Sequence, residues 1–76
     1  MSLTKQELKH YYHLIRKEHG KEIEKAIIEK QAQKPLDILV YTHQLLLDHY
    51  PEIADNDYAN AFDLSKCFFY DFSFLY

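Results

Sequence analysis

Hydrophobic residues recur along most of the chain at the three- and four-residue intervals of an α-helix, and two prolines divide the pattern into segments. In the first segment, Leu8, Tyr12, Ile15 and Ile23 share one side of a helix. The TKQE sequence before them has the form of a capping box, in which a threonine hydroxyl and a glutamate carboxylate each bind a free backbone amide. This pattern predicts a first helix over residues 5–33.

A single glycine lies inside this first segment. Gly20 could end a helix, yet no Ser, Thr, Asp or Asn follows nearby to start a new one, and the apolar phase is unchanged beyond it. A glycine within a helix costs about 1 kcal/mol relative to alanine, which a packed face can offset. We therefore predict that the helix is continuous, with a possible bend at Gly20.

The segment between the two prolines is the most apolar. Pro35 suits the first turn of a helix. In residues 36–50 the polar side chains Asp37, Gln44 and Asp48 form only a narrow stripe. This predicts a second helix over 36–50 that is buried on most sides and central in the fold.

The third segment follows a loop rich in helix-capping residues. We expect Asp55, Asn56 or Asp57 to cap a helix over residues 57–72. The side of this helix that the spacing assigns to the core carries Tyr58, Ala61, Phe62, Ser65, Phe69, Phe72 and Tyr76.

The end of the chain has two interpretations. Aromatic residues occupy every even position from 68 to 76, an alternation typical of a β-strand. A lone strand in a helical chain could pair only with a second copy. We therefore predict a frayed or extended tail over 73–76, in one all-α, three-helix domain spanning residues 1–76.

Composition narrows the possible functions. The chain has 76 residues, one glycine and one cysteine, Cys67. Glycine-rich phosphate loops and paired-cysteine zinc sites are therefore excluded, and an intramolecular disulfide cannot form. No run is long enough to span a membrane, and the charged N-terminus is unlike a secretory signal. We expect a cytoplasmic protein without a cofactor or metal. Enzymatic activity is not expected either, since nothing resembles a nucleophile turn.

Helix lengths and aromatic content indicate self-association. A helix over 5–33 would span about 43 Å, whereas one over 36–50 would span about 22 Å. One copy cannot cover the longer helix from end to end. Seven tyrosines and five phenylalanines add to the surface that needs cover. We therefore predict a homodimer in which two copies complete one core.

The aromatic C-terminal segment is the predicted contact surface for another protein. Phe62, Phe69 and Phe72 are assigned to the core, but the remaining rings cannot all face the same interior. Exposed aromatic residues of this kind are typical of interfaces. The sequence thus favours an interaction module (a regulator, adaptor or inhibitor) whose partner-binding residues are Phe68, Tyr70, Phe74 and Tyr76.

Charge distribution leaves a second interpretation open. Residues 1–34 carry eight of the nine Lys and Arg residues, whereas residues 35–76 carry one, against seven acids. A nucleic-acid-binding regulator could use the basic first helix to contact phosphates. The net charge of −3 and the missing helix-turn-helix motif make this the less favoured alternative. The residues concerned are Lys5, Lys9, Arg16, Lys17 and Lys21.

Two of the five histidines lie on apolar faces. His19 and His43 are expected to be partly buried and hydrogen-bonded, as such residues usually are. A sharper hypothesis makes them a pH-sensitive core, because a buried neutral His43 would have to become charged in acid. His10 and His13 have a metal-ligand spacing with Glu7, but they point away from the core, so no metal site is predicted.

Overall fold

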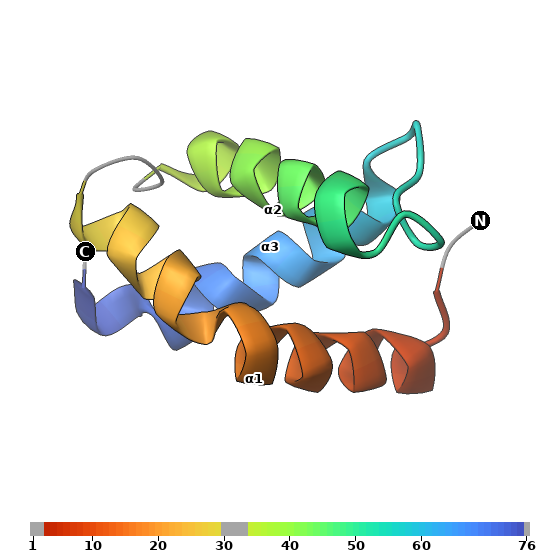
Figure 1. Cartoon of the computed structure of the whole chain (residues 1–76), viewed down its shortest axis with the longest axis horizontal. Helices are drawn as coiled ribbons and strands as arrows, with labels where there is room; N and C mark the ends of the chain where they lie inside the picture. The colour runs from red at the N-terminus through yellow and green to blue at the C-terminus, as the bar shows by residue number, and fades with distance from the viewer. Residues whose placement is uncertain (1–2, 30–33, 76) are drawn as a thin grey trace.

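The protein is an all-helical bundle in the computed structural model, which describes residues 3–29 and 34–75. Within these ranges no strand is present, so the predicted fold class is confirmed. The elements are α1 (Lys5–Ile28), α2 (Pro35–His49), α3 (Ala59–Asp71) and a final 3-10 turn, η1 (Ser73–Leu75). Helix α3 packs against both α1 and α2 (Figure 1). No helix of the described ranges has the length and apolar character needed to cross a membrane.

The first helix begins at the predicted capping box. The hydroxyl of Thr4 accepts a hydrogen bond from the Glu7 amide at 3.2 Å, and the Glu7 carboxylate accepts one from the Thr4 amide at 3.1 Å. These bonds lower the pKa of Glu7. Helix α1 runs through Gly20 without interruption. It gives way to a turn at Glu29, so it ends earlier than predicted, and the rest of the predicted range, 30–33, lies outside the described residues.

Helix α2 has the predicted extent but is not buried on most sides. Its buried residues are confined to one face, formed by Ile38, Thr42, Leu45 and Leu46. Leucine and valine side chains on the outer side remain exposed. The prediction was wrong because one chain of this size supplies too few neighbouring helices to surround an apolar helix completely.

The entry into α3 differs from the predicted acidic cap. The N-cap residue is Tyr58, which adopts a left-handed backbone conformation with φ of 61° and makes no capping hydrogen bond through its side chain. The Tyr58 ring stacks on His43 of α2, with 4.1 Å between the ring centroids. A His43 ring nitrogen also lies 3.2 Å from the carbonyl oxygen of Asp55. The loop is thus held against α2, and this contact accompanies the tight turn at Tyr58.

The buried face of α3 is rotated from the predicted one. Phe68 is only 1% exposed, whereas Phe62, which was assigned to the core, is 49% exposed. Phe72 is buried as expected, and Phe69 is half-buried. Two helices press on α3 from different sides, so its position between them decides which aromatic ring is covered. The largest fully buried apolar side chains are Phe68, Phe72, Ile15, Ile27, Leu46 and Leu64.

The C-terminal segment continues as a tighter helical turn instead of an extended tail. The amide of Leu75 donates to the carbonyl oxygen of Phe72 at 2.9 Å, within the 3-10 turn η1. The prediction of an extended tail was therefore wrong for residues 73–75, and Tyr76 lies outside the described residues. The alternation of aromatic residues therefore does not mark a β-strand in residues 73–75.

Candidate interaction groove between α2 and α3

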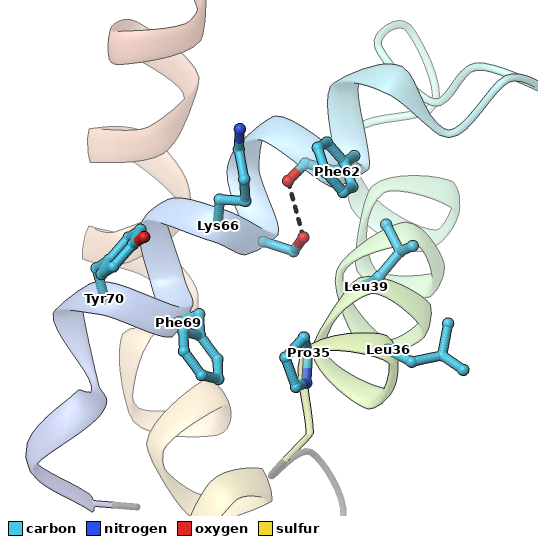
Figure 2. A pocket seen from close by; sticks show the side chains of 8 residues that line it. Pro35, Leu36, Leu39, Phe62, Lys66, Phe69 and Tyr70 are labelled. Carbon is cyan, nitrogen blue, oxygen red and sulfur yellow. Dashed lines mark hydrogen bonds between the residues drawn. The ribbon is translucent and has the colours of Figure 1, made fainter.

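An apolar groove of about 410 Å3 lies between the start of α2 and the second half of α3. Figure 2 shows the side chains of the two helices around it. Helix α2 contributes its first turns, and α3 contributes residues on successive turns of its outer side. The lining residues are Pro35, Leu36, Leu39, Phe62, Ser65, Lys66, Phe69 and Tyr70.

Ser65 is a buried polar residue in the lining of the groove. The hydroxyl of Ser65 donates a hydrogen bond to the carbonyl oxygen of Phe62 at 2.9 Å (Figure 2). Because this bond satisfies the hydroxyl within its own helix, the small Ser65 side chain lets Leu39 and Phe69 line a nearly apolar surface. A surface of this kind favours an apolar ligand.

One cation marks the edge of the groove. Of the lining residues in the described part of the chain, only Lys66 is charged. Its ammonium group lies over the Phe62 ring, 4.9 Å from the centroid. A cation–π contact of this geometry contributes about 0.5–1 kcal/mol at an exposed site. This contact therefore keeps the Lys66 ammonium next to the Phe62 ring, where a ligand carboxylate could reach it.

The predicted partner-binding residues are distributed over several environments. Tyr70 lines the groove and is 76% exposed, and Phe74 in η1 is 71% exposed. Phe68, in contrast, lies in the core, where its ring contacts Tyr12 with centroids 5.2 Å apart. Its assignment to a contact surface is therefore corrected, because a buried ring cannot meet a partner. Tyr76 lies outside the described residues.

Sequence reasoning missed most of the groove. Leu36, Leu39 and Phe62 were assigned to faces that the chain was expected to bury. A usable signal was present, since α2 has apolar residues around more of its circumference than one neighbouring helix can cover. The uncovered apolar surface thus lies on α2 and α3 and not, as helix lengths had suggested, along α1. On α1, only Ile28 is a large, clearly exposed hydrophobic residue.

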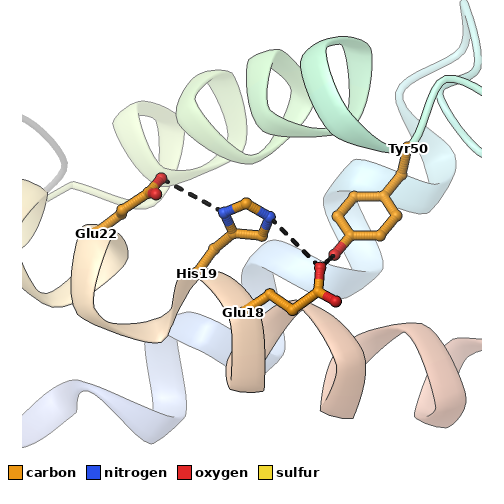
Figure 3. A network of polar contacts seen from close by, with 4 residues as sticks. All are labelled: Glu18, His19, Glu22 and Tyr50. Carbon is orange, nitrogen blue, oxygen red and sulfur yellow. Dashed lines mark hydrogen bonds and ion pairs between the residues drawn. The ribbon is translucent and has the colours of Figure 1, made fainter.

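The two predicted core histidines lie in different surroundings. His19 is buried between helices, with its Nδ1 3.5 Å from the Glu22 carboxylate and its Nε2 3.9 Å from that of Glu18 (Figure 3). Its ring also lies 4.4 Å from the ring of His49, measured between centroids. His43 is half-buried at the loop before α3. Whether either residue couples assembly to pH stays a prediction.

The hydroxyl of Tyr50 completes the polar network at the end of α2. It donates a hydrogen bond to the Glu18 carboxylate at 2.8 Å (Figure 3). Burial, this hydrogen bond and the charges of Glu18 and Glu52 raise the pKa of Tyr50 to about 12. The network therefore stabilises the neutral, protonated form of Tyr50 in the folded chain.

This shift predicts a loss of stability in alkali. The unfolded chain releases the Tyr50 proton near pH 10, and the folded chain only near pH 12. The contribution is complete below pH 10 and is lost as the pH rises through about 12. Urea unfolding at pH 8 and pH 11 should show a larger fall in the free energy of unfolding for the wild type than for Tyr50→Phe. Equal falls would contradict the assignment.

Four lysines of α1 are spread over its exposed surface, about 160° around the helix axis from first to last. Lys5, Lys9, Lys17 and Lys21 are exposed and lie four or eight residues apart. Arg16 does not join them, because its guanidinium lies 3.5 Å from the Asp71 carboxylate and 4.2 Å from the centre of the Phe72 ring. Nucleic-acid binding by this helix stays a prediction, now without Arg16 as a free phosphate ligand.

The surroundings of Cys67 do not activate it as a catalytic nucleophile. Burial and the nearby Asp63 carboxylate raise the pKa of this thiol, against a smaller opposing effect of Lys66. A raised pKa disfavours the reactive thiolate.

In residues 3–29 and 34–75, no three His, Cys, Asp or Glu side chains are grouped as a metal site would need. Comparison with known proteins adds no assignment: no family model, curated protein or solved structure matches the chain.

Proposed function

We propose that this protein is a small intracellular interaction module, without enzymatic activity, that holds an amphipathic helix in the groove between α2 and α3. The observation that carries the proposal is the groove itself, with apolar walls on two helices and Lys66 as the one charged residue among the described residues that line it. The free thiol of Cys67 supports a reducing compartment. A regulator, adaptor or inhibitor would act by such binding alone.

The shape and chemistry of the groove specify the ligand. Two adjacent helices with an apolar seam accept the apolar face of a third helix, whose anchors recur at i, i+4 and i+7. Leu39, Phe62 and Phe69 would contact these anchors. Lys66 would meet a carboxylate beside them, which gives the ligand a direction as well as a face. The proposed ligand is therefore an amphipathic helix with an acidic residue at one edge.

A synthetic peptide tests this proposal. The probe is a helical peptide with leucines at i, i+4 and i+7 and a glutamate beside them, added to the labelled protein while NMR spectra are recorded. Saturable shifts are expected at Leu39, Ser65 and Phe69. Replacing the peptide glutamate with lysine should weaken binding by roughly three- to tenfold, the value of one partly exposed ion pair.

Two variants of the protein complete the experiment. Phe62→Glu places a charge in the apolar wall and should abolish saturable binding. Gln6→Glu makes the same change of charge as Phe62→Glu, but at an exposed position of α1, and should leave the affinity within about twofold. Equal affinity in Phe62→Glu, or shifts confined to residues outside the groove, would contradict the proposed site.

A further inference from the structure

Next to the groove, the outer side of α2 carries a row of uncovered apolar residues. Leu36 and Val40 are 69% and 60% exposed, and Leu47 is about half exposed. At about 100° per residue, these three side chains lie within about 40° of one another around the helix axis. We call them the α2 ridge. Val40 and Leu47 do not line the groove. Helix α2 is thus itself an amphipathic helix of the kind that the groove would take.

We propose that the groove is occupied by the α2 ridge of a second copy of this chain. This inference rests on the proposed function and names an occupant for the same site. Groove and ridge lie side by side on one face, so a two-fold axis parallel to α2 inserts each ridge into the other groove at the same time. The two α2 helices then run parallel in contact, and each is flanked on its other side by α3 of the second copy.

Charge complementarity supports this arrangement. Around α2, Leu39 lies on the groove side of the ridge and the exposed Asp37 lies on the opposite side, about 160° away from it. In the two-fold pair, that opposite side faces α3 of the second copy, where Lys66 stands at the groove edge. A two-fold axis parallel to α2 sets equal residues of the two copies at the same height, so Asp37 comes about level with the second copy's Leu36, which lines the same groove as Lys66. Two identical ion pairs result.

The uncovered area is of the size that a dimer needs. Leu36, Val40, Phe62 and Tyr70 are each about half to three-quarters exposed. With side-chain areas of about 150–200 Å2, they leave roughly 400 Å2 of apolar surface on each copy. The half-buried Leu39 and Phe69 and a polar rim extend this toward the roughly 800 Å2 per partner of a standard interface. A self-associated copy therefore hides the groove, and another helix has to compete for it.

Sedimentation equilibrium over a range of concentrations tests the inference. The wild type is expected to be a dimer. Val40→Glu puts a charge on the ridge without touching the groove lining, and should raise the dissociation constant of the dimer by about a hundredfold or more. Gln6→Glu adds the same charge at an exposed position of α1, and should leave that constant within about twofold. Circular dichroism shows whether each variant is folded. A monomeric wild type, or a dimer that Val40→Glu leaves intact, would overturn the proposal.

A charge exchange tests the predicted pairing without relying on one variant. Lys66→Glu and Asp37→Lys, each alone, set like charges against each other twice in the two-fold dimer, so both should dimerise more weakly than the wild type. An equimolar mixture restores one pair in exchanged form and one in native form, so the mixed dimer should predominate. No preference for the mixed dimer would overturn the proposed arrangement.

The peptide probe separates this inference from the proposed function. The Val40→Glu monomer keeps a free groove and should bind the acidic amphipathic peptide more tightly than the wild type does. Peptide binding by a wild type that never dimerises would overturn the inference and leave the function standing. A dimer broken by Val40→Glu whose monomer binds no peptide would support the second copy as occupant and overturn recognition of another helix.

Discussion

Phe68→Ala is expected to lower the free energy of unfolding by about 3–5 kcal/mol, the usual loss for a buried phenylalanine. The Phe68 ring is fully buried and contacts Tyr12 of α1. Alanine would leave a cavity between two helices that cannot close without moving α1. Because a domain of this size has a total stability of only about 5–10 kcal/mol, the variant should lose about a third or more of its stability. Urea unfolding followed by circular dichroism measures the effect.

An exposed aromatic residue outside the groove provides the matched control. Phe74 lies in η1, and its side chain is mostly exposed. Phe74→Ala also removes a phenyl ring from the C-terminal segment, yet it should change the free energy of unfolding by less than about 0.5 kcal/mol. If the two variants lost similar stability, the orientation of α3 described above would be wrong.

Asn60→Ala is expected to cost about 2–4 kcal/mol, although the side chain is polar. Asn60 is buried, and its amide nitrogen donates to the carbonyl oxygen of Ile53 at 3.0 Å. Its amide oxygen accepts from the backbone amide of Leu3 at 3.1 Å. Alanine would leave both backbone groups without these partners, and each unsatisfied group costs about 1–3 kcal/mol. One side chain thus joins the start of the chain and the loop before α3 to the bundle.

Thermal unfolding and hydrogen exchange together measure this effect. The melting temperature of Asn60→Ala should fall, and the Leu3 amide should lose protection from exchange. Asn56→Ala removes the same kind of side chain from an exposed position in the loop before α3, and should leave the melting temperature and the protection of Leu3 nearly unchanged. Unchanged protection of Leu3 in Asn60→Ala would show that this hydrogen bond does not hold the N-terminus.

The proposed interaction surface follows from a shortage of covering elements. Helix α3 lies against both other helices, yet Phe62 and Tyr70 on its outer side stay exposed. Helix α2 has its main packing contacts with α3 alone, and the side of α2 that bears Leu36 and Val40 is left open. A helix from outside the chain, which we infer to be α2 of a second copy, would supply the missing layer.

Local interactions made the elements predictable. The capping box at Thr4 and Glu7 starts α1 with bonds between residues three apart, and Pro35 starts α2 through its own fixed backbone angle. These effects act within one turn of helix, so neighbouring residues in the sequence are enough to predict them. The helix that passes through Gly20 is a similar case, because its apolar phase is visible on both sides of the glycine.

The orientation of α3 depended on contacts between elements. Phe62, Phe68 and Phe72 have the same chemistry and lie on α3 or at its C-cap, and only the placement of α1 and α2 decides that the first is exposed and the other two are buried. The same holds for Tyr58, whose left-handed turn accompanies the contact of its ring with His43. Residues distant in sequence decide such features.

The sequence alone establishes that the chain is helical, where its first two helices begin, and that it carries more apolar and aromatic surface than one small domain can bury. Those properties depend on hydrogen bonds and periodicity within a few residues. The position of the exposed apolar surface, at Leu36, Val40, Phe62 and Tyr70 beside the Lys66 ammonium, follows from the packing of the helices. Burial is shared among whole helices, so which apolar face remains open is settled only when they pack.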